Sequence, residues 1–291
     1  MQTSDILKRV RQIEFKTGKL VRETFAGQYL SVFKGQGIEF SEVRQYIAGD
    51  DIRSIDWNVS ARTGNTYVKK FNEERELSVI IACDVSASEY FGSKGNLKAQ
   101  AAIELASVFA FSAIKNNDKV GLLLFSDKVE LYIPPRKGRR HVLRIIRELL
   151  AFEPKRKGTN ISLALSTLIR LIKRQGILLF ISDFLDENYA KPFKLASKKF
   201  DLIPVLLEDP LEFNFPRLSA LVQIQDAEGG TCGILTRNSA KQIVQTRKEN
   251  LAKTLNLFKL SGVDYINIDA SKNTLDPVIK FFKQRARKLG V

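Results

Sequence analysis

LSVIIACDVSAS, residues 77–88, is an apolar-rich run that passes directly into a row of polar side chains. Its first part, 77–83, has the composition of a parallel strand that is buried on both faces. Asp84, Ser86 and Ser88 then place one carboxylate and two hydroxyls at alternate positions. Alternate residues of an extended chain point the same way. The segment therefore predicts a buried strand whose carboxyl end presents three oxygen groups to one point.

Strand-like and helix-like patterns alternate through the rest of the chain. Strands are expected at 119–125, 128–133, 176–182, 201–207 and 263–268, and helices at 97–115, 139–150, 161–174, 190–199, 239–260 and 275–289. This alternation predicts an α/β fold with a doubly wound, mostly parallel sheet that helices cover on both faces. The tight turn at Ser126-Asp127 predicts one antiparallel edge strand. The turn at 228–230 predicts a hairpin insertion near 219–236.

The region before this segment has a different texture. A short amphipathic helix at 3–16 precedes β-like runs and turns, so residues 1–75 are expected to form a helix and a small β-rich module before a domain at 76–291. Acidic and basic residues are interspersed at 44–62 in this module: Arg44, Asp50, Asp51, Arg53, Asp56 and Arg62. They suit either a ligand cluster or internal ion pairs and turn hydrogen bonds, and the second interpretation is favoured. Trp57, the only tryptophan, is expected to be a packing anchor at the junction between this module and the sheet.

The composition limits the classes of function. Lys and Arg number 47 against 32 Asp and Glu, which gives a formal net charge of +15 and favours acidic partners without choosing among them. Two cysteines make no disulfide framework or zinc spacing, and Cys83 is expected to be a buried thiol. No apolar run approaches the ~18 residues of a membrane span, and the start does not resemble a signal peptide. A cytoplasmic location is expected.

Two further residues are positioned to join the oxygens of the 84–88 segment. Right-handed crossovers bring the carboxyl ends of parallel strands to one side of a sheet, so Asp183, after the strand at 176–182, can meet Asp84. Thr159, in the loop before the helix at 161–174, adds a hydroxyl. Six oxygens suit Mg²⁺, or Mn²⁺, and neutral hydroxyls would leave the ion charged enough to bind an outside carboxylate. The alternative is that these residues only form turns and helix caps.

The pattern Asp-x-Ser-x-Ser, a loop Thr and a later Asp resembles the metal-ion-dependent adhesion site of von Willebrand factor A domains. The resemblance implies that Asp84, Ser86, Ser88, Thr159 and Asp183 bind the metal, directly or through water. It also implies a protein-interaction module rather than an enzyme. Glu89 stands where relatives often carry methionine, a position that is not a ligand in that family.

Upstream motifs extend the resemblance to a bacterial family, domain of unknown function 58. They are Gly35–Phe40, Arg44–Tyr46, Gly49–Asp51, Ile55–Trp57 and Ser60–Arg62. Members of this family are typically encoded near MoxR-type AAA+ ATPases and are thought to assist them. The resemblance therefore implies an adaptor or co-chaperone for such an ATPase. An acidic segment of the partner would supply a carboxylate to the metal, and Lys155, Arg156 and Lys157 would form a cationic rim beside it.

Two other functions were weighed. A Mg²⁺-dependent phosphohydrolase of the haloacid dehalogenase kind also begins with an Asp at a strand end, but it needs a second Asp where Ser86 stands. Nucleic-acid binding would use the basic runs at 136–140 and 280–288, which lack interleaved aromatic side chains for base stacking. A single histidine, His141, leaves little for Ser-His-Asp catalysis, and no P-loop occurs. No catalytic residue is assigned, and nucleic acid is not expected as a partner.

Overall fold

The computed structural model describes residues 3–20, 39–72, 77–93, 97–153, 158–214, 222–225 and 232–288. The chain divides into two compact units, residues 33–77 and the remainder, and each is described by itself. The first helix, α1 (Thr3–Leu20), belongs to the larger unit. The sequence pattern places this helix with the small module, whereas the structure groups it with the larger unit.

A six-stranded sheet forms the centre of the larger unit, in the order β10-β7-β6-β3-β4-β5. Its strands are β3 (Ser78–Asp84), β4 (Lys119–Phe125), β5 (Val129–Arg136), β6 (Ile177–Ser182), β7 (Asp201–Glu208) and β10 (Ile266–Asp269). All neighbouring strands are parallel except β4 and β5, which form an antiparallel hairpin. The predicted mostly parallel sheet with one antiparallel edge strand is therefore confirmed.

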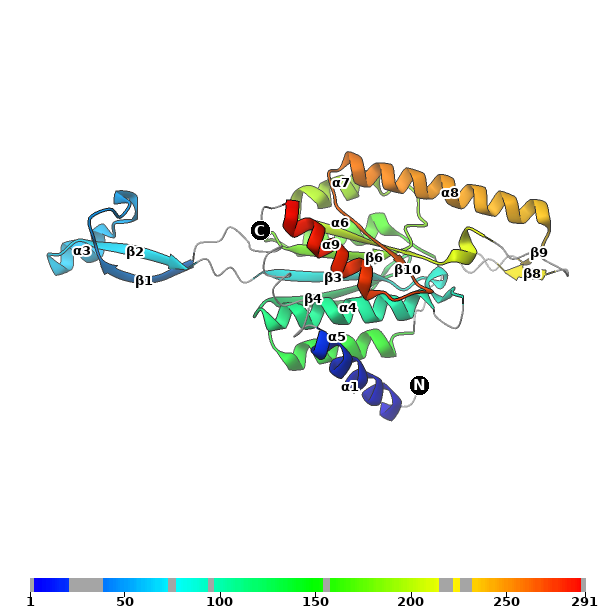
Figure 1. The fold of residues 1–291 in the computed structure, drawn as a ribbon, viewed down its shortest axis with the longest axis horizontal. Helices are drawn as coiled ribbons and strands as arrows, with labels where there is room; N and C mark the ends of the chain where they lie inside the picture. The colour runs from blue at the N-terminus through cyan, green and yellow to red at the C-terminus, as the bar shows by residue number, and fades with distance from the viewer. Residues whose placement is uncertain are drawn as a thin grey trace. The chain divides into compact units, whose positions relative to one another are not determined.

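Helices cover both faces of this sheet, as Figure 1 shows. They are α4 (Lys98–Lys115), α5 (Arg139–Ala151), α6 (Ile161–Leu171), α7 (Ala190–Lys199), α8 (Arg237–Leu260) and α9 (Leu275–Lys288). Side chains from α6, α7 and α8 share one core cluster with Ile80 and Phe180 of the sheet. On the opposite face α4 and α9 meet through Phe109 and Phe282, whose ring centroids lie 5.7 Å apart. Successive strand residues point to opposite faces, so each strand contributes to both cores.

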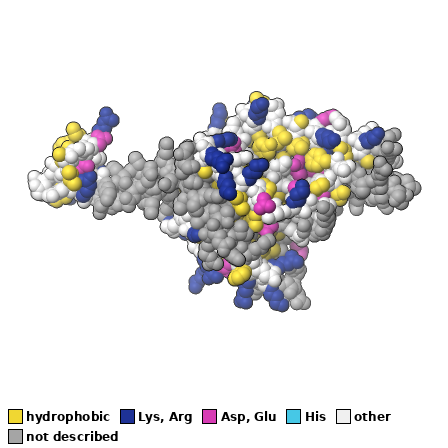
Figure 2. Space-filling model, in the orientation of Figure 1, with side chains coloured by type: hydrophobic (Ala, Val, Ile, Leu, Met, Phe, Trp, Pro, Cys, Tyr) yellow, Lys and Arg dark blue, Asp and Glu magenta, His cyan; other side chains and the backbone are white. Residues whose placement is uncertain are grey.

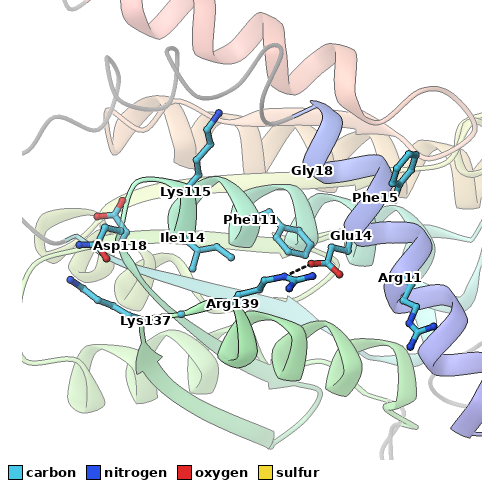
Figure 3. Close-up of a pocket in the computed structure, with 12 residues that line it drawn as sticks. Arg11, Glu14, Phe15, Gly18, Phe111, Ile114, Lys115, Asp118, Lys137 and Arg139 are labelled. Atoms are coloured by element: carbon cyan, nitrogen blue, oxygen red, sulfur yellow. Dashed lines mark hydrogen bonds and ion pairs between the residues drawn. The ribbon is translucent and has the colours of Figure 1, made fainter.

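The helix α1 lies against α4 and α5 on the outer side of one helical layer (Figure 3). Glu14 of α1 accepts a hydrogen bond from Nε of Arg139, the first residue of α5, at 2.6 Å. Phe111 and Ile114 of α4 line the hollow beside this ion pair. Arg139 is largely exposed, so the pair contributes little free energy. Val10 of α1 is buried, so apolar contact also contributes to the attachment.

Two residues singled out in the sequence have structural roles. Cys83 is a free thiol that is 1% exposed, and burial raises its pKa. Nε2 of His141 lies 2.9 Å from the main-chain oxygen of Val120. Val120 lies near the amino end of β4, whereas Asp84 pairs with Phe125 at its carboxyl end. The histidine is thus at the opposite end of the sheet from the predicted metal site.

The small unit is a two-stranded antiparallel sheet with short helices. β1 (Glu39–Gln45) pairs with β2 (Tyr67–Asn72), and η2 (Ile52–Ser54) and α3 (Trp57–Thr63) lie between them in sequence. Arg44 forms a two-pronged ion pair with Asp50, at 2.6 and 2.8 Å. Asp51 and Asp56 accept main-chain hydrogen bonds at the starts of η2 and α3. These acidic residues form turns, caps and ion pairs, as the favoured interpretation predicted.

Trp57 is exposed within the small unit. Its side chain is 68% exposed, because it begins α3 in a unit too small to enclose it. Its role as a packing anchor at the junction with the sheet stays a prediction, since the two units are each described by themselves. A hairpin of β8 (Val222–Gln225) and β9 (Cys232–Leu235) lies in the region where an insertion was predicted.

No helix among the described segments is long and apolar enough to cross a membrane.

The aromatic core beneath α8 should dominate the stability of the larger unit. Phe258 is fully buried, and its ring lies 5.1 Å from both Phe184 and Phe193. We expect Phe258→Ala to lower the free energy of unfolding by about 3–5 kcal/mol, because it leaves a cavity in a packed core. Leu260, on the same helix, is 69% exposed, so Leu260→Ala should change it by less than about 0.5 kcal/mol. Urea denaturation measures both, and equal losses would contradict this packing.

Candidate metal centre

The candidate site lies where the order of strands in the sheet reverses. From β3 the chain moves to β4 on one side, and later returns to β6 on the other side of β3. In open α/β sheets such a switch point leaves a crevice at the carboxyl ends of the two central strands. β3 ends at Asp84, and Asp183 directly follows β6. The fold therefore brings these two carboxylates to the same edge.

The carboxylate of Asp84 is held from two directions. Its Oδ1 accepts a hydrogen bond from the amide of Ser86 at 2.9 Å, and its Oδ2 accepts one from Oγ of Ser182 at 2.8 Å. The same Ser182 oxygen accepts a hydrogen bond from the amide of Phe184 at 3.0 Å. Asp84 is 3% exposed, so its charge lies inside the protein. These bonds orient the side chain.

A strained turn presents Asp183. The next residue, Phe184, has φ of 55°, in the left-handed region that bulky side chains rarely adopt. The ring of Phe184 is buried among Phe180, Tyr189 and Phe258, which hold it there. Oδ1 of Asp183 accepts the amide of Leu185 at 3.1 Å. The aromatic core thus supports the turn that directs this carboxylate.

The hydroxyls predicted from the motif are partly brought together. Oγ of Ser86 and Oγ of Ser88 lie 3.1 Å apart, at the start of the short helix η3 (Ala87–Tyr90). Thr159 is half-buried in the loop before α6. That loop is tied by the amide of Asn160 to the main-chain oxygen of Ser126, and by the amide of Ile161 to Asp186. Thr159 as a ligand stays a prediction.

Glu89 is part of the site, although the motif did not assign it a role there. It is fully buried, and its Oε1 accepts a hydrogen bond from the amide of Asp183 at 3.1 Å. One carboxylate oxygen from each of Asp84, Glu89 and Asp183 lies within 4.8 Å of the other two. The signal in the sequence was a charged residue directly after the Asp-x-Ser-x-Ser run, where the related pattern has methionine.

A buried lysine, which no sequence motif indicated, faces the same carboxylates. Lys98, the first residue of α4, is 1% exposed. Its ammonium donates to Oδ2 of Asp183 at 2.6 Å and to Oε1 of Glu212 at 2.8 Å. A cation at a helix N-terminus is disfavoured by the helix dipole, so these carboxylates must hold it. Lys98 carries no motif spacing, so only the fold reveals its role.

An arginine from α8 completes this ion-pair network. Nε of Arg247 donates to Oε2 of Glu212 at 2.9 Å, and its Nη1 lies 3.4 Å from the main-chain oxygen of Asp183. The guanidinium also lies over the ring of Phe213, 5.4 Å from its centroid. Glu212 therefore bridges Lys98 and Arg247. The network ties α4, α8 and the turn after β6 to one another.

Negative charge is in excess in the cluster. The four carboxylates of Asp84, Glu89, Asp183 and Glu212 face the two cations of Lys98 and Arg247, which leaves two negative charges unmatched. Burial, together with the nearby charge of Asp183, raises the pKa of Asp84 to about 7. Burial likewise raises the pKa of Glu89 well above its usual value. Without a further cation, the surplus is relieved by protons on these groups.

The pKa of Asp183 shifts in the opposite direction to those of Asp84 and Glu89. Burial alone would raise its pKa, but the adjacent Lys98 ammonium outweighs it and holds the pKa of Asp183 below its usual value. Burial opposes the charge of Lys98 as well, yet the surrounding carboxylates, Asp183 first, raise the pKa of Lys98. This pair is therefore ionised, and the unmatched charge falls on Asp84 and Glu89.

These residues fit a hard divalent cation. Carboxylate and hydroxyl oxygens are the donors that Mg²⁺ and Mn²⁺ prefer. Around a Mg²⁺ ion with bonds of ~2.1 Å, neighbouring ligand oxygens lie about 3 Å apart and opposite ones about 4 Å apart. One oxygen from each of the three carboxylates lies within 4.8 Å of the other two, so the three groups surround a volume in which one cation can contact them all. A charge of +2 would also balance the surplus.

The predicted cationic rim lies outside the described residues, since Lys155, Arg156 and Lys157 fall in the gap at 154–157. The second basic run can be placed. Arg136 pairs with Val120, so the 136–140 segment lies at the amino end of β4, away from the carboxylate cluster. On the face that Figure 2 shows, Lys and Arg side chains are interspersed with acidic and apolar ones. That pattern is typical of a solvated surface.

The fold and the cluster define an α/β protein with a buried carboxylate site at the switch point of its sheet. The chain belongs to the DUF58 family of proteins of unknown function, whose model matches residues 42–254. Uncharacterized proteins of Mycobacterium tuberculosis and Mycobacterium bovis are 25% identical to it over 286 residues. The match covers 96% of this chain and 89% of each relative. The predicted family is confirmed.

Two solved structures from Bacteroides are similar to the chain. One is the conserved hypothetical protein BatB of Bacteroides thetaiotaomicron, at 17% identity and a TM-score of 0.47, covering 72% of this chain and 99% of that one. The other is an aerotolerance-related membrane protein of Bacteroides fragilis, at 19% identity and a TM-score of 0.49, covering 73% and 99%. These values are too low to carry an argument about function.

The buried lysine yields a direct test of the network. Replacing Lys98 by methionine leaves Asp183 and Glu212 without their main counter-ion, and breaking a buried pair in this way costs about 3–5 kcal/mol. We expect Lys98→Met to lower the free energy of unfolding by that amount. Lys248→Met, on an exposed side chain of α8, should change it by less than about 0.5 kcal/mol. Equal stability of the two variants in urea denaturation would refute the network.

Proposed function

We propose that this protein is a divalent-metal-dependent protein-interaction module of the von Willebrand factor A type. Mg²⁺, or Mn²⁺, would be held by Asp84, Ser86, Ser88, Thr159 and Asp183. The observation that carries the proposal is the meeting of Asp84 and Asp183 at one sheet edge, in a buried cluster with two unmatched negative charges. A buried surplus of this kind is costly unless a cation or protons compensate for it.

The residues of the site have different roles in holding the metal. Ser182 and the amide of Ser86 orient the carboxylate of Asp84. Lys98 orients Asp183 and keeps it ionised. Ser86 and Ser88 contribute neutral oxygens, which do not reduce the charge of the ion. When bound, the cation supplies a positive centre for a carboxylate of a partner protein.

The proposed partner is an acidic segment, and the proposed setting is adaptor work with a MoxR-type AAA+ ATPase in the cytoplasm. The family resemblance supports the ATPase, and the formal net charge of +15 supports an acidic partner. Affinity purification from the native cell, with and without EDTA, tests this directly. A MoxR-type ATPase that co-purifies only without EDTA is the expected result. Co-purifying nucleic acid would instead favour a basic nucleic-acid-binding protein.

Metal binding is the first prediction of this proposal. Asp84→Asn should weaken Mn²⁺ binding by at least 10–100-fold, a loss that even outer residues of metal sites produce. The double change Ser86→Ala/Ser88→Ala should weaken it as well, because two neutral ligands are lost. Isothermal titration calorimetry on the full chain measures both.

A matched control is available at the same edge of the sheet. Ser271 follows β10, and its hydroxyl donates to Asp269 rather than to the cluster. Ser271→Ala should leave Mn²⁺ affinity unchanged. If Asp84→Asn binds Mn²⁺ as tightly as the wild type, the metal proposal is wrong.

The second prediction concerns the cationic rim of Lys155, Arg156 and Lys157. Lys155 and Lys157 come directly before Gly158 and Thr159 in the chain. Reversing both to Glu should slow the association of an acidic partner at low salt, and the difference from wild type should shrink as salt rises. Stopped-flow association rates measure this. The same reversal at Arg139 and Arg140 should matter less, and a larger effect there would place the partner at the other end of the sheet.

Absence of catalysis is the third prediction. Ser86 occupies the place of the general acid that dehalogenase-type phosphohydrolases need, and His141 lies at the far end of the sheet. Hydrolysis of a phosphomonoester such as p-nitrophenyl phosphate, with Mg²⁺ present, should stay at background. Turnover that disappears in Asp84→Asn would overturn the prediction and favour the phosphohydrolase.

A further inference from the structure

Glu89 has an unsatisfied oxygen at the centre of the cluster. Its Oε1 accepts the amide of Asp183, but its Oε2 is buried and has no hydrogen-bond partner in the described part of the chain. Buried polar atoms without a partner are uncommon in folded proteins, and each calls for an explanation such as an ion. Carboxylate oxygens of Asp84 and Asp183 lie within 4.8 Å of an oxygen of Glu89. A cation among the three would satisfy this side chain.

The lysine in the cluster does not remove the need for that cation. Its ammonium donates to Asp183 and Glu212, both on the side of the cluster that Arg247 also contacts. Among the described residues, Asp84 accepts hydrogen bonds from Ser86 and Ser182, and neither carries a positive charge. Burial holds the pKa of Glu89 well above its usual value, and it outweighs the charge of Lys98, which also acts on Glu89 and lowers its pKa. Lys98 therefore does not compensate for the charge of Asp84 and Glu89 together.

Glu89 also decides the net charge of a loaded site. Without it, the carboxylates of Asp84, Asp183 and Glu212 exceed the two cations by one, so a divalent ion would leave a net charge of +1. Such a site attracts an outside carboxylate. With Glu89 ionised, the excess is two, and the same ion leaves the site neutral. A neutral site attracts an outside carboxylate far less.

We propose that Glu89 is itself a ligand of the cation, and that it competes with the partner's carboxylate for the metal. The inference rests on the proposed function and specifies how the site is regulated. The chain's own carboxylate closes the metal site until an acidic partner displaces it. Glu89 therefore strengthens binding of the metal and weakens binding of the partner's carboxylate.

The surroundings of Glu89 suit such an exchange. It lies in η3, a helix of only four residues, and the main-chain amide of Asp183 donates a hydrogen bond to its Oε1. The next two residues, Tyr90 and Phe91, are 46% and 40% exposed. They offer a partner an apolar surface that continues directly from η3. The segment best matched to this surface carries an acidic residue beside an apolar one.

Two measurements on the full chain test the proposal. Mn²⁺ affinity is measured by electron paramagnetic resonance, and acetate binding to the Mn²⁺-saturated protein is measured by paramagnetic relaxation of its carbon signals. We expect Glu89→Gln to weaken Mn²⁺ binding by about 10–100-fold and to strengthen acetate binding at least tenfold. Glu89→Met should act in the same direction, and it serves if the amide variant folds poorly in thermal melts.

A matched control removes the same charge nearby. Glu187 is exposed, four residues after Asp183, so Glu187→Gln should change neither quantity. Unchanged Mn²⁺ affinity in both Glu89 variants, with binding lost in Asp84→Asn, would overturn this inference and leave the proposed function standing. Weaker Mn²⁺ binding without stronger acetate binding would overturn the competition. A wild-type chain that binds no Mn²⁺ would refute the proposed function together with the inference.

Discussion

The rest of the site depends on the buried ion pairs that the ammonium of Lys98 forms with two carboxylates. The ammonium lies between Asp183 and Glu212 at the start of α4, where the helix dipole disfavours a positive charge. Only the surrounding carboxylates make that position tolerable. In return, the lysine keeps Asp183 ionised in a place where burial would neutralise it. One side chain thus joins α4, the end of β6 and the turn before the hairpin.

The network leaves a charge imbalance among buried side chains. Ion pairing serves Asp183 and Glu212, while Asp84 and Glu89 have only neutral hydrogen-bond donors. Inside a protein such groups must either take up protons or face a cation. The imbalance is therefore better explained as the basis of a binding site than as a source of stability. It also explains why an aromatic core holds the strained turn at Phe184, because that turn directs Asp183 into the cluster.

Much of the fold follows from local pattern. The apolar run at 77–83 predicted β3, and the Ser126-Asp127 turn predicted the antiparallel edge strand that the structure contains. The strands at 176–182 and 201–207 agree closely with β6 and β7. Boundaries were less accurate where the pattern was weak: the strand expected at 263–268 is Ile266–Asp269. The grouping of α1 was also missed, because its partners on α4 and α5 are far away in sequence.

By itself the sequence determined the mostly parallel sheet, the family, and the placement of Asp84 and Asp183 at strand ends, because buried strands and tight turns are marked by local composition. The tertiary structure decided which other charges meet there. Lys98, Glu212 and Arg247 come from α4, the short helix η4 (Pro210–Glu212) and α8, and no spacing in the chain links them. Glu89 lies beside the motif, but its burial against Asp183 depends on a strand 94 residues away. Ion pairing inside a protein depends on distance in space, and only the packed sheet and helices set those distances.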